Sequence, residues 1–133
     1  MGSRPETGYG CGMDGFAGQL GVRAERSGDG GASLELVAGA EHLNPAGTVH
    51  GGVLATLVDT AMGLAARTTT NDAEVPATSQ LTIAYLRPGH EGLLHVTAEV
   101  RTRGEHLLVC EADVEQDGKP LVHAVASFAI LQD

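Results

Sequence analysis

The stretch Asn44–Gly63, NPAGTVHGGVLATLVDTAMG, carries the strongest structural signals in the chain. Its Asn-Pro pair and Gly47 indicate an ordered loop over residues 39–49. From about Gly51 to Arg67, apolar side chains recur at the i, i+3, i+4 spacing of a helix that buries one face, and the polar residues 68–76 end it. The apolar positions are Leu54, Leu57, Val58, Ala61, Met62, Leu64 and Ala65. The stretch therefore predicts one long amphipathic helix that opens at His-Gly-Gly.

Segments on both sides of this helix have the composition of β-strands. Residues 20–26 and 32–38 are two short candidates joined by Ser-Gly-Asp-Gly-Gly, a strong turn signal. Four longer segments alternate apolar and polar residues with period two, namely 78–87, 92–103, 106–116 and 119–131. This order predicts an α+β fold, an antiparallel sheet of five to six strands with one long helix. We expect residues 15–133 to form this single domain and residues 1–14 to be a disordered tail.

Composition and charge argue against several functional classes. A net charge of −9 disfavours a nucleic-acid partner, because phosphate binding needs a concentrated basic face. No apolar run approaches the ~20 residues of a membrane span, and no secretory signal follows the N-terminus. The two cysteines, Cys11 and Cys110, and the six histidines form no zinc-binding pattern, so neither a metal site nor a cofactor is expected. These features favour a soluble cytoplasmic protein with free thiols.

The His-Gly-Gly helix start is a candidate anion site. The first N–H groups of a helix have no intrahelical acceptor and lie at the positive end of the helix dipole. Because Gly51 and Gly52 have no side chains, they leave these groups open to an anion or a developing oxyanion. The alternative is that the two glycines merely permit a tight junction between loop and helix.

Asp59 is the only acidic residue of the predicted helix and lies within its apolar stretch. A carboxylate buried there costs free energy unless it is paired or used in chemistry. The alternative is a boundary residue that faces water.

The spacing between these two features predicts a dimer. Gly51 and Asp59 are eight residues apart, about 12 Å along a helix axis, so they do not converge easily on one reacting group within one chain. Two antiparallel helices across a twofold axis would bring Gly51 of one subunit near Asp59 of the other. The last strand is also half apolar on its second face, which independently indicates an oligomer, at Leu121, Val125, Ala129 and Leu131.

The whole motif resembles the hotdog-fold thioesterases, in particular their phenylacetate-pathway (PaaI-like) branch. That branch has Asn-Pro, Gly, His-Gly-Gly, an Asp nine residues after the His, and later a strand that ends in an aromatic residue and Arg-Pro. The matching elements here are Asn44-Pro, Gly47, His50-Gly-Gly, Asp59 and Tyr85-Leu-Arg-Pro. The related 4-hydroxybenzoyl-CoA branch has Glu at the Asp59 position and Thr four residues later, where this chain has Gly63. The resemblance covers about residues 16–131 and implies the hotdog fold, with the sheet wrapped around the long helix.

The resemblance also implies catalytic roles at five positions. Asp59 acts as nucleophile, or as general base on water, at a thioester carbonyl. Gly51 supplies the oxyanion N–H, and Asn44 orients the thioester oxygen or the water. His50 positions the loop and the substrate. Thr78 contributes a hydroxyl that assists the water or the carboxylate. The neighbouring Ser79 could take this position instead if the match is shifted by one residue.

The activity implied is hydrolysis of an aromatic or medium-chain acyl-CoA to the free acid and CoA. The acyl group is expected in a tunnel between subunits, lined by Leu54, Val58 and Met62. Gly52 and Arg87 are expected as further substrate contacts. The alternative function is a non-catalytic acyl-CoA-binding hotdog module.

The partners implied are acyl-CoA and further copies of this chain. We expect a homodimer with shared active sites that assembles into a homotetramer. Four arginines either form a local patch for CoA phosphates or are ordinary surface charges, namely Arg67, Arg87, Arg101 and Arg103.

Overall fold

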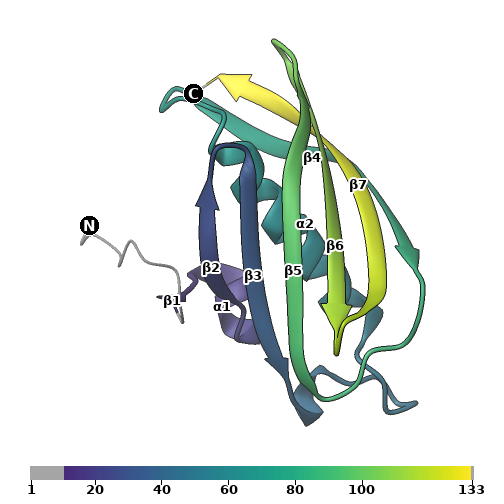
Figure 1. Ribbon diagram of the computed structural model, residues 1–133. Helices are drawn as coiled ribbons and strands as arrows, with labels where there is room; N and C mark the ends of the chain where they lie inside the picture. The colour runs from purple at the N-terminus through teal and green to yellow at the C-terminus, as the bar shows by residue number, and fades with distance from the viewer. Residues whose placement is uncertain (1–10, 133) are drawn as a thin grey trace.

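The structure is a computed structural model, and it describes residues 11–132. Along the chain, the elements are β1 (Cys11–Gly12), α1 (Gly15–Leu20), β2 (Arg23–Gly28), β3 (Gly31–Ala38), the 3-10 turn η1 (Ala40–His42), α2 (Gly51–Arg67), β4 (Glu74–Tyr85), β5 (Gly92–Arg103), β6 (Leu107–Gln116) and β7 (Lys119–Gln132). The strands form one antiparallel sheet in the order β1-β2-β3-β5-β6-β7-β4. The sheet curves around α2 (Figure 1), which confirms the predicted α+β hotdog architecture.

The predicted helix and most strands lie where the sequence pattern places them, but the N-terminal region differs. Most of the predicted tail, residues 1–10, lies outside the described residues. Cys11 and Gly12 pair with Ala24 and Arg23 of β2, so the tail prediction is wrong for these two residues. The short helix α1 was not predicted. None of the described helices is both long and apolar enough to cross a bilayer.

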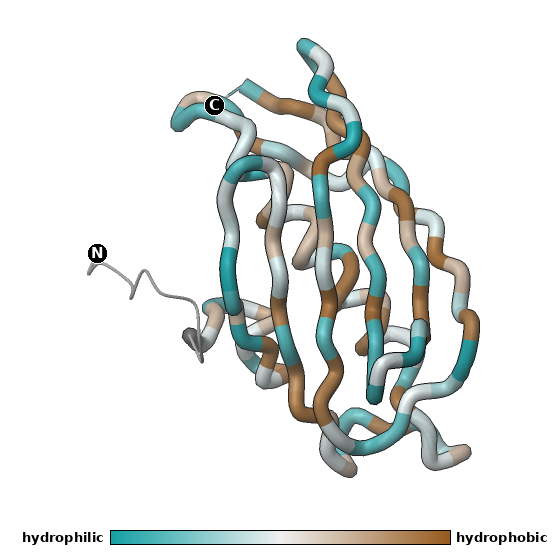
Figure 2. Tube along the Cα trace, viewed as in Figure 1, coloured by the Kyte–Doolittle hydropathy of each residue, from teal (hydrophilic) through white to brown (hydrophobic). Residues whose placement is uncertain are grey.

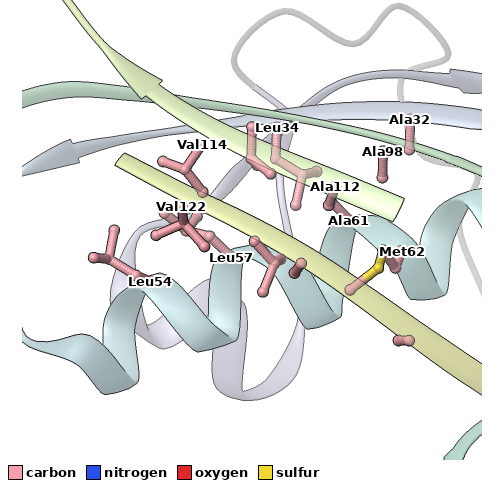
Figure 3. Packing of buried hydrophobic residues seen from close by; sticks show 14 of the residues in the cluster. Ala32, Leu34, Leu54, Leu57, Ala61, Met62, Ala98, Ala112, Val114 and Val122 are labelled. Carbon is pink, nitrogen blue, oxygen red and sulfur yellow. The ribbon is translucent and has the colours of Figure 1, made fainter. Parts of the chain in front are cut away.

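Helix α2 packs its apolar face against the sheet. Its buried side chains are Val53, Leu54, Leu57, Val58, Ala61, Met62, Ala65 and Ala66. Figure 3 shows several of them facing side chains of the strands, including Leu34, Val114 and Val122. Burial of each Leu, Val or Met side chain stabilises the fold by roughly 1.5–3 kcal/mol. Alanines on the sheet, such as Ala98 and Ala112, leave room for the helix to approach closely.

The strands alternate between core-facing and solvent-facing side chains. Buried positions recur at every second residue along β3, β5, β6 and β7. Figure 2 shows the corresponding alternation of hydropathy along the central strands. One face of the sheet is therefore apolar and covers α2, and the other is polar and carries most of the sheet's charged groups.

Strand β4 lies at one edge of the sheet and pairs only with β7 among the described residues. It begins at Glu74, four residues before the predicted start at 78, because the end of β7 extends far enough to pair with it. Pro76 is tolerated within the strand because an edge strand has one side without ladder hydrogen bonds.

A β-bulge interrupts β4 at Ser79. Thr78 pairs with Phe128 of β7, whereas Gln80 pairs with Ser127, the preceding residue on that antiparallel strand, so Ser79 is an extra residue. Because Phe128 and Ala126 both point into the core, their partners Thr78 and Leu81 both face α2. The two positions are at i and i+3, with two residues between them, a spacing that uninterrupted alternation would put on opposite faces.

Buried His42 fixes the loop that precedes α2. Its Nδ1 accepts a hydrogen bond from Gly39 N–H at 2.9 Å, and its Nε2 donates to the Leu20 carbonyl at 2.7 Å, which defines the neutral tautomer protonated on Nε2. The His42 carbonyl in turn accepts from His50 N–H at 2.8 Å. One buried residue thus links the end of α1 to the start of α2.

Glu74 ties the end of α2 to the sheet. Its Oε1 accepts from Asn71 N–H at 3.1 Å and from Arg103 Nη2 at 2.9 Å. The backbone hydrogen bond from Asn71, followed by the Arg103 guanidinium, lowers the pKa of the Glu74 carboxyl. Arg67, the last residue of α2, donates to the Glu74 carbonyl.

Candidate active site

The first turn of α2 has the geometry of an open N–H site. His50 is the N-cap residue, and its Nδ1 accepts from Gly52 N–H at 2.8 Å. A Cβ on Gly52 would lie 3.1 Å from this Nδ1, so a larger residue there would press on the capping imidazole. Gly51 N–H has no acceptor among residues 11–132. The predicted oxyanion donor is therefore available, and His50 positions it by capping the neighbouring N–H.

Tyr85, at the end of β4, braces the same turn. Its hydroxyl donates to the Gly51 carbonyl at 2.9 Å, and its ring passes close to the Gly51 Cα. A Cβ on Gly51 would lie 3.4–3.6 Å from the Tyr85 phenol. The sequence motif contained Tyr85 without indicating this role.

Asp59 and Thr78 come together although they are 19 residues apart. Thr78 Oγ1 donates to Asp59 Oδ1 at 2.8 Å. Ser79, the competing candidate, instead donates its hydroxyl hydrogen to the Ser127 carbonyl at 3.1 Å. The bulge in β4 decides between the two hydroxyls, because it turns Thr78 toward α2. Asp59 Oδ2 has no protein partner among residues 11–132 and stays open to water or substrate.

An open pocket of about 390 Å³ lies beside Asp59. Helices α1 and α2 and strand β4 line it, through Phe16, Ala17, Ala55, Thr56, Asp59, Thr60 and Leu81. Most of these walls are apolar or small, and Asp59 is the only charged group. This composition suits an acyl group next to a reacting carboxylate.

The predicted acyl lining is wrong for Leu54, Val58 and Met62. These side chains are 3%, 0% and 0% exposed, because they lie on the helix face that packs against the sheet. The residues around Asp59 on the helix are Ala55, Thr56 and Thr60 instead. The apolar stripe of α2 forms the core of the protomer, so a ligand can reach only the other face. The helical period places the residues three and four positions before and after Asp59 on its own face, so the sequence could have indicated this face.

Asn44 stays within its own loop. Its Oδ1 accepts from Ala46 N–H and Thr48 N–H at 2.9 and 3.1 Å, and its Nδ2 donates to Thr48 Oγ1 at 2.9 Å. These bonds make Asn44 a loop-shaping residue in the protomer. Its predicted contact with thioester or water stays a prediction.

The four arginines do not form one patch. Three of them form ion pairs with acidic residues. Arg67 pairs with Asp72, Arg101 with Glu99 and Glu111, and Arg103 with Glu74. Arg87 lies in a second pocket of about 410 Å³, with Lys119 on its wall, between the loop after β4 and the β6–β7 turn. Neither Arg87 nor Lys119 has an ion-pair partner among residues 11–132, although Asp117 lines the same pocket. Arg87 thus remains the arginine of the four that is available to a phosphate.

Other reactive groups lie away from this face of α2. The buried Cys110 thiol donates weakly to the Met62 carbonyl at 3.8 Å, and burial raises its pKa to about 11. His95 pairs with Glu25, and His123 with Asp113, on the polar face of the sheet. Within residues 11–132, no three His, Cys, Asp or Glu side chains gather in an arrangement that would hold a metal ion.

Comparison with known families agrees with this geometry. The family model of the thioesterase superfamily matches residues 46–123, more than half of the chain. The chain belongs to the thioesterase superfamily. The matched region includes the first turn of α2, Asp59, Thr78 and Arg87.

Individual members of this superfamily and related proteins match over most of the chain. A protein of Saccharolobus solfataricus, named provisionally as an esterase, is 33% identical over 77% of this chain and 74% of its own length. A solved structure from Ralstonia eutropha, named provisionally as a thioesterase related to phenylacetic acid degradation, is 32% identical with a TM-score of 0.79, covering 85% of this chain and 87% of that chain. A protein of Bacillus halodurans, solved with CoA, is 35% identical with a TM-score of 0.72, covering 74% and 66%.

For a thioesterase-superfamily chain, the site supplies two parts of the required chemistry. A carboxylate with one oxygen held and one oxygen free can attack a carbonyl carbon or accept a proton from water. An unpaired N–H at a helix start can stabilise a developing oxyanion. The two parts lie about two helical turns apart in one protomer, since eight residues at 1.5 Å per residue span about 12 Å.

Proposed function

We propose that this thioesterase hydrolyses acyl-CoA thioesters to the free acid and CoA, with Asp59 as the reacting carboxylate. The observation that carries the proposal is the Asp59 carboxylate itself, held by the Thr78 hydroxyl at 2.8 Å in a pocket with otherwise apolar and small walls. Folding alone does not require an acid at this helix position. An aromatic or medium-chain acyl group fits the character of these walls.

Two reaction routes start from this carboxylate. As general base, Asp59 Oδ2 accepts a proton from water, the water oxygen bonds to the thioester carbon, and the C–S bond then breaks to release CoA thiolate, which takes up the proton. As nucleophile, Oδ2 bonds to the carbon directly, CoA leaves, and water then cleaves the acyl-aspartyl anhydride. Single-turnover hydrolysis in 18O-labelled water tests for the second route, because water that attacks the aspartyl carbonyl of the anhydride leaves label in the Asp59 carboxylate, whereas the first route puts all of the label in the free acid.

The oxyanion donor is proposed to come from a second copy of the chain. The half-buried face of α2 carries small residues around Asp59, including Ala55 and Gly63, so another helix can approach closely. The edge of β4 is unpaired among the described residues, which leaves backbone groups for a second sheet. Two antiparallel α2 helices would then place Gly51 of each copy near Asp59 of the other. Assembly of such dimers into a tetramer stays a prediction from sequence.

The CoA moiety is proposed to bind near Arg87. The Arg87 guanidinium has no acidic partner among residues 11–132 and can bind a phosphate by donating two parallel N–H hydrogen bonds to its oxygens. Its loop packs against the loop that leads into α2, through the hydrogen bond of Val49 N–H to the Gly89 carbonyl at 2.9 Å. The CoA-bound relative of Bacillus halodurans supports this class of ligand.

The deciding experiment is CoA release from phenylacetyl-, hydroxybenzoyl-, short-, medium- and long-chain acyl-CoA, by wild type and Asp59→Asn. The variant keeps the size of the side chain and removes its charge, so we expect the rate to fall on the order of 100-fold or more. Asp72→Asn, which removes an exposed carboxylate at the far end of α2, is the matched control and should retain wild-type rates. Tight binding of an acyl-CoA without turnover by the wild type would instead establish a non-catalytic binding module.

A further inference from the structure

Helix α1 places an aromatic side chain beside the reacting carboxylate. Phe16 is 66% exposed and lines the same pocket as Asp59. The chain has two phenylalanines, and the other, Phe128, is only 2% exposed in the core. An aromatic ring gains free energy from burial, so one that lines the same pocket as Asp59, together with Ala17, Ala55 and Leu81, can contact an apolar part of a ligand bound there.

The exposure of Phe16 does not reflect a loose helix. The adjacent Ala17 is 8% exposed in the core, and its carbonyl accepts from Val22 N–H at 3.1 Å. The Leu20 carbonyl, also at the C-terminal end of α1, accepts from buried His42 at 2.7 Å. The helix is therefore anchored at its C-terminal end, and Phe16 lines the pocket from the first half of the helix.

The pocket that contains Asp59 and Phe16 also has apolar walls. Ala17 and Ala55 are small, and Leu81 adds an aliphatic wall from β4. The Thr56 hydroxyl is already bonded to the Gly52 carbonyl at 2.8 Å and does not need a ligand partner. A thioester carbon placed at Asp59 would thus have its acyl substituent against apolar atoms.

We propose that, given the acyl-CoA thioesterase activity proposed above, Phe16 is a specificity-determining residue that selects acyl groups carrying an aromatic ring. Aromatic pairs prefer offset or edge-to-face contact and gain free energy beyond the area that they bury. An alkyl chain of similar size gains only from the buried area. The ring of Phe16 therefore discriminates between aryl-acyl and alkyl-acyl substrates.

The test compares kcat/KM for phenylacetyl-CoA and octanoyl-CoA, whose acyl groups have the same number of carbons, in wild type, Phe16→Ala and Val37→Ala. Val37 is also 66% exposed but lies on β3, outside the pocket, so it controls for loss of an exposed apolar side chain. In Phe16→Ala, the ratio of phenylacetyl to octanoyl kcat/KM should fall about two- to tenfold, the factor that an aromatic pair supplies. In Val37→Ala, the ratio should stay at the wild-type value. A ratio in Phe16→Ala that equals the wild-type ratio, whether or not both rates fall, would overturn the proposal.

A binding measurement separates failure of this proposal from failure of the thioesterase reaction. The thioethers S-(2-phenylethyl)-CoA and S-octyl-CoA cannot be hydrolysed, and their affinities are measurable by calorimetric titration. Tighter binding of the phenylethyl compound to wild type, lost in Phe16→Ala, supports the role of Phe16 even if the wild type hydrolyses no thioester. Equal affinities of the two compounds for wild type would overturn it while leaving any measured hydrolysis intact.

Discussion

Thr78 donates its hydroxyl hydrogen to Asp59 Oδ1, so the two oxygens of this carboxylate are not equivalent. The bonded oxygen has a fixed position, and the rotation of the carboxylate is restricted. The other oxygen, Oδ2, has no protein partner among residues 11–132, and its position is restricted in turn. A hydroxyl that holds a reacting group in this way acts on the rate of reaction more than on the affinity for substrate.

Replacement of Thr78 by Val tests this function, because the two side chains have similar shape and only Thr has a donor. We expect kcat to fall about 10- to 100-fold, the range of a hydrogen bond to a charged group, with a small change in KM. Thr78→Ser should restore most of the rate. Steady-state kinetics on the best substrate measures both. Ser79→Ala is the matched control, since its hydroxyl bonds only the Ser127 carbonyl, and a loss as large as that of Thr78→Val would contradict the assignment.

Cys110 illustrates how burial suppresses chemistry at a single residue. Its pKa is raised to about 11, because the apolar core disfavours the thiolate, which is the reactive form. At pH 8, only about one thiol in a thousand would be ionised. In a Cys11→Ser variant, we expect no reaction of Cys110 with an aromatic disulfide reagent on the timescale of minutes, and full reaction in guanidinium chloride. Fast labelling of the native variant would show that the core opens at this strand.

At the scale of elements, the loop before α2 depends on one buried histidine. His42 is 3% exposed and bonds both Gly39 N–H and the Leu20 carbonyl. Phenylalanine would fill the same space but would leave both groups without partners. We expect His42→Phe to lower the free energy of unfolding by about 2 kcal/mol or more, at 1–3 kcal/mol for each unsatisfied buried group. Urea denaturation measures the loss. The exposed His106→Phe is the control and should change stability by less than about 0.5 kcal/mol.

Sequence periodicity was sufficient to predict α2 and the four long strands, because each buries one face and the burial enforces a period. It was not sufficient for α1, which is six residues long and too short to show a period. The same limit applies to the bulge at Ser79. Its position depends on pairing with β7, a strand about 50 residues away, so no local pattern separates Thr78 from Ser79.

The position of the candidate site on the loop and helix start could be predicted from the sequence, but the free face of the helix was predicted wrongly. His50 caps the first turn of α2 and Asp59 bonds Thr78, while the catalytic roles of Gly51, His50 and Asp59 stay predictions. Leu54, Val58 and Met62 were assigned to the substrate because they are apolar, but the same property places them in the core. Phe16 could not be recognised from sequence, since only the packing of α1 brings it to Asp59.

At the scale of the whole molecule, an active site shared between two chains predicts that two inactive variants restore activity when they form a mixed dimer. Asp59→Asn removes the carboxylate, and Gly51→Pro removes the proposed oxyanion N–H at a first helical position that accepts proline. Each variant alone should be inactive. After the two are mixed in equal amounts and exchanged, half of the dimers contain both variants, and one of their two sites has Gly51 and Asp59 intact.

We therefore expect about a quarter of wild-type activity to return in the mixture. Hydrolysis is followed before and after subunit exchange, with light scattering to confirm dimers. Mixtures that stay inactive despite exchange would show that each chain works alone. Mixing either variant with itself is the control for the exchange procedure.

The bulge at Ser79 bears on how this chain should be aligned with others. An insertion is already absorbed at that point, so a homologous sequence without the extra residue would pair β4 with β7 continuously and still turn the same hydroxyl toward the helix. The count of residues between this hydroxyl and Tyr85 at the end of β4 can thus differ by one, whereas the count between the helical acid and the hydroxyl stays the same. The equivalent residue in another member is the one that pairs opposite the Phe128 position, whatever its distance along the chain.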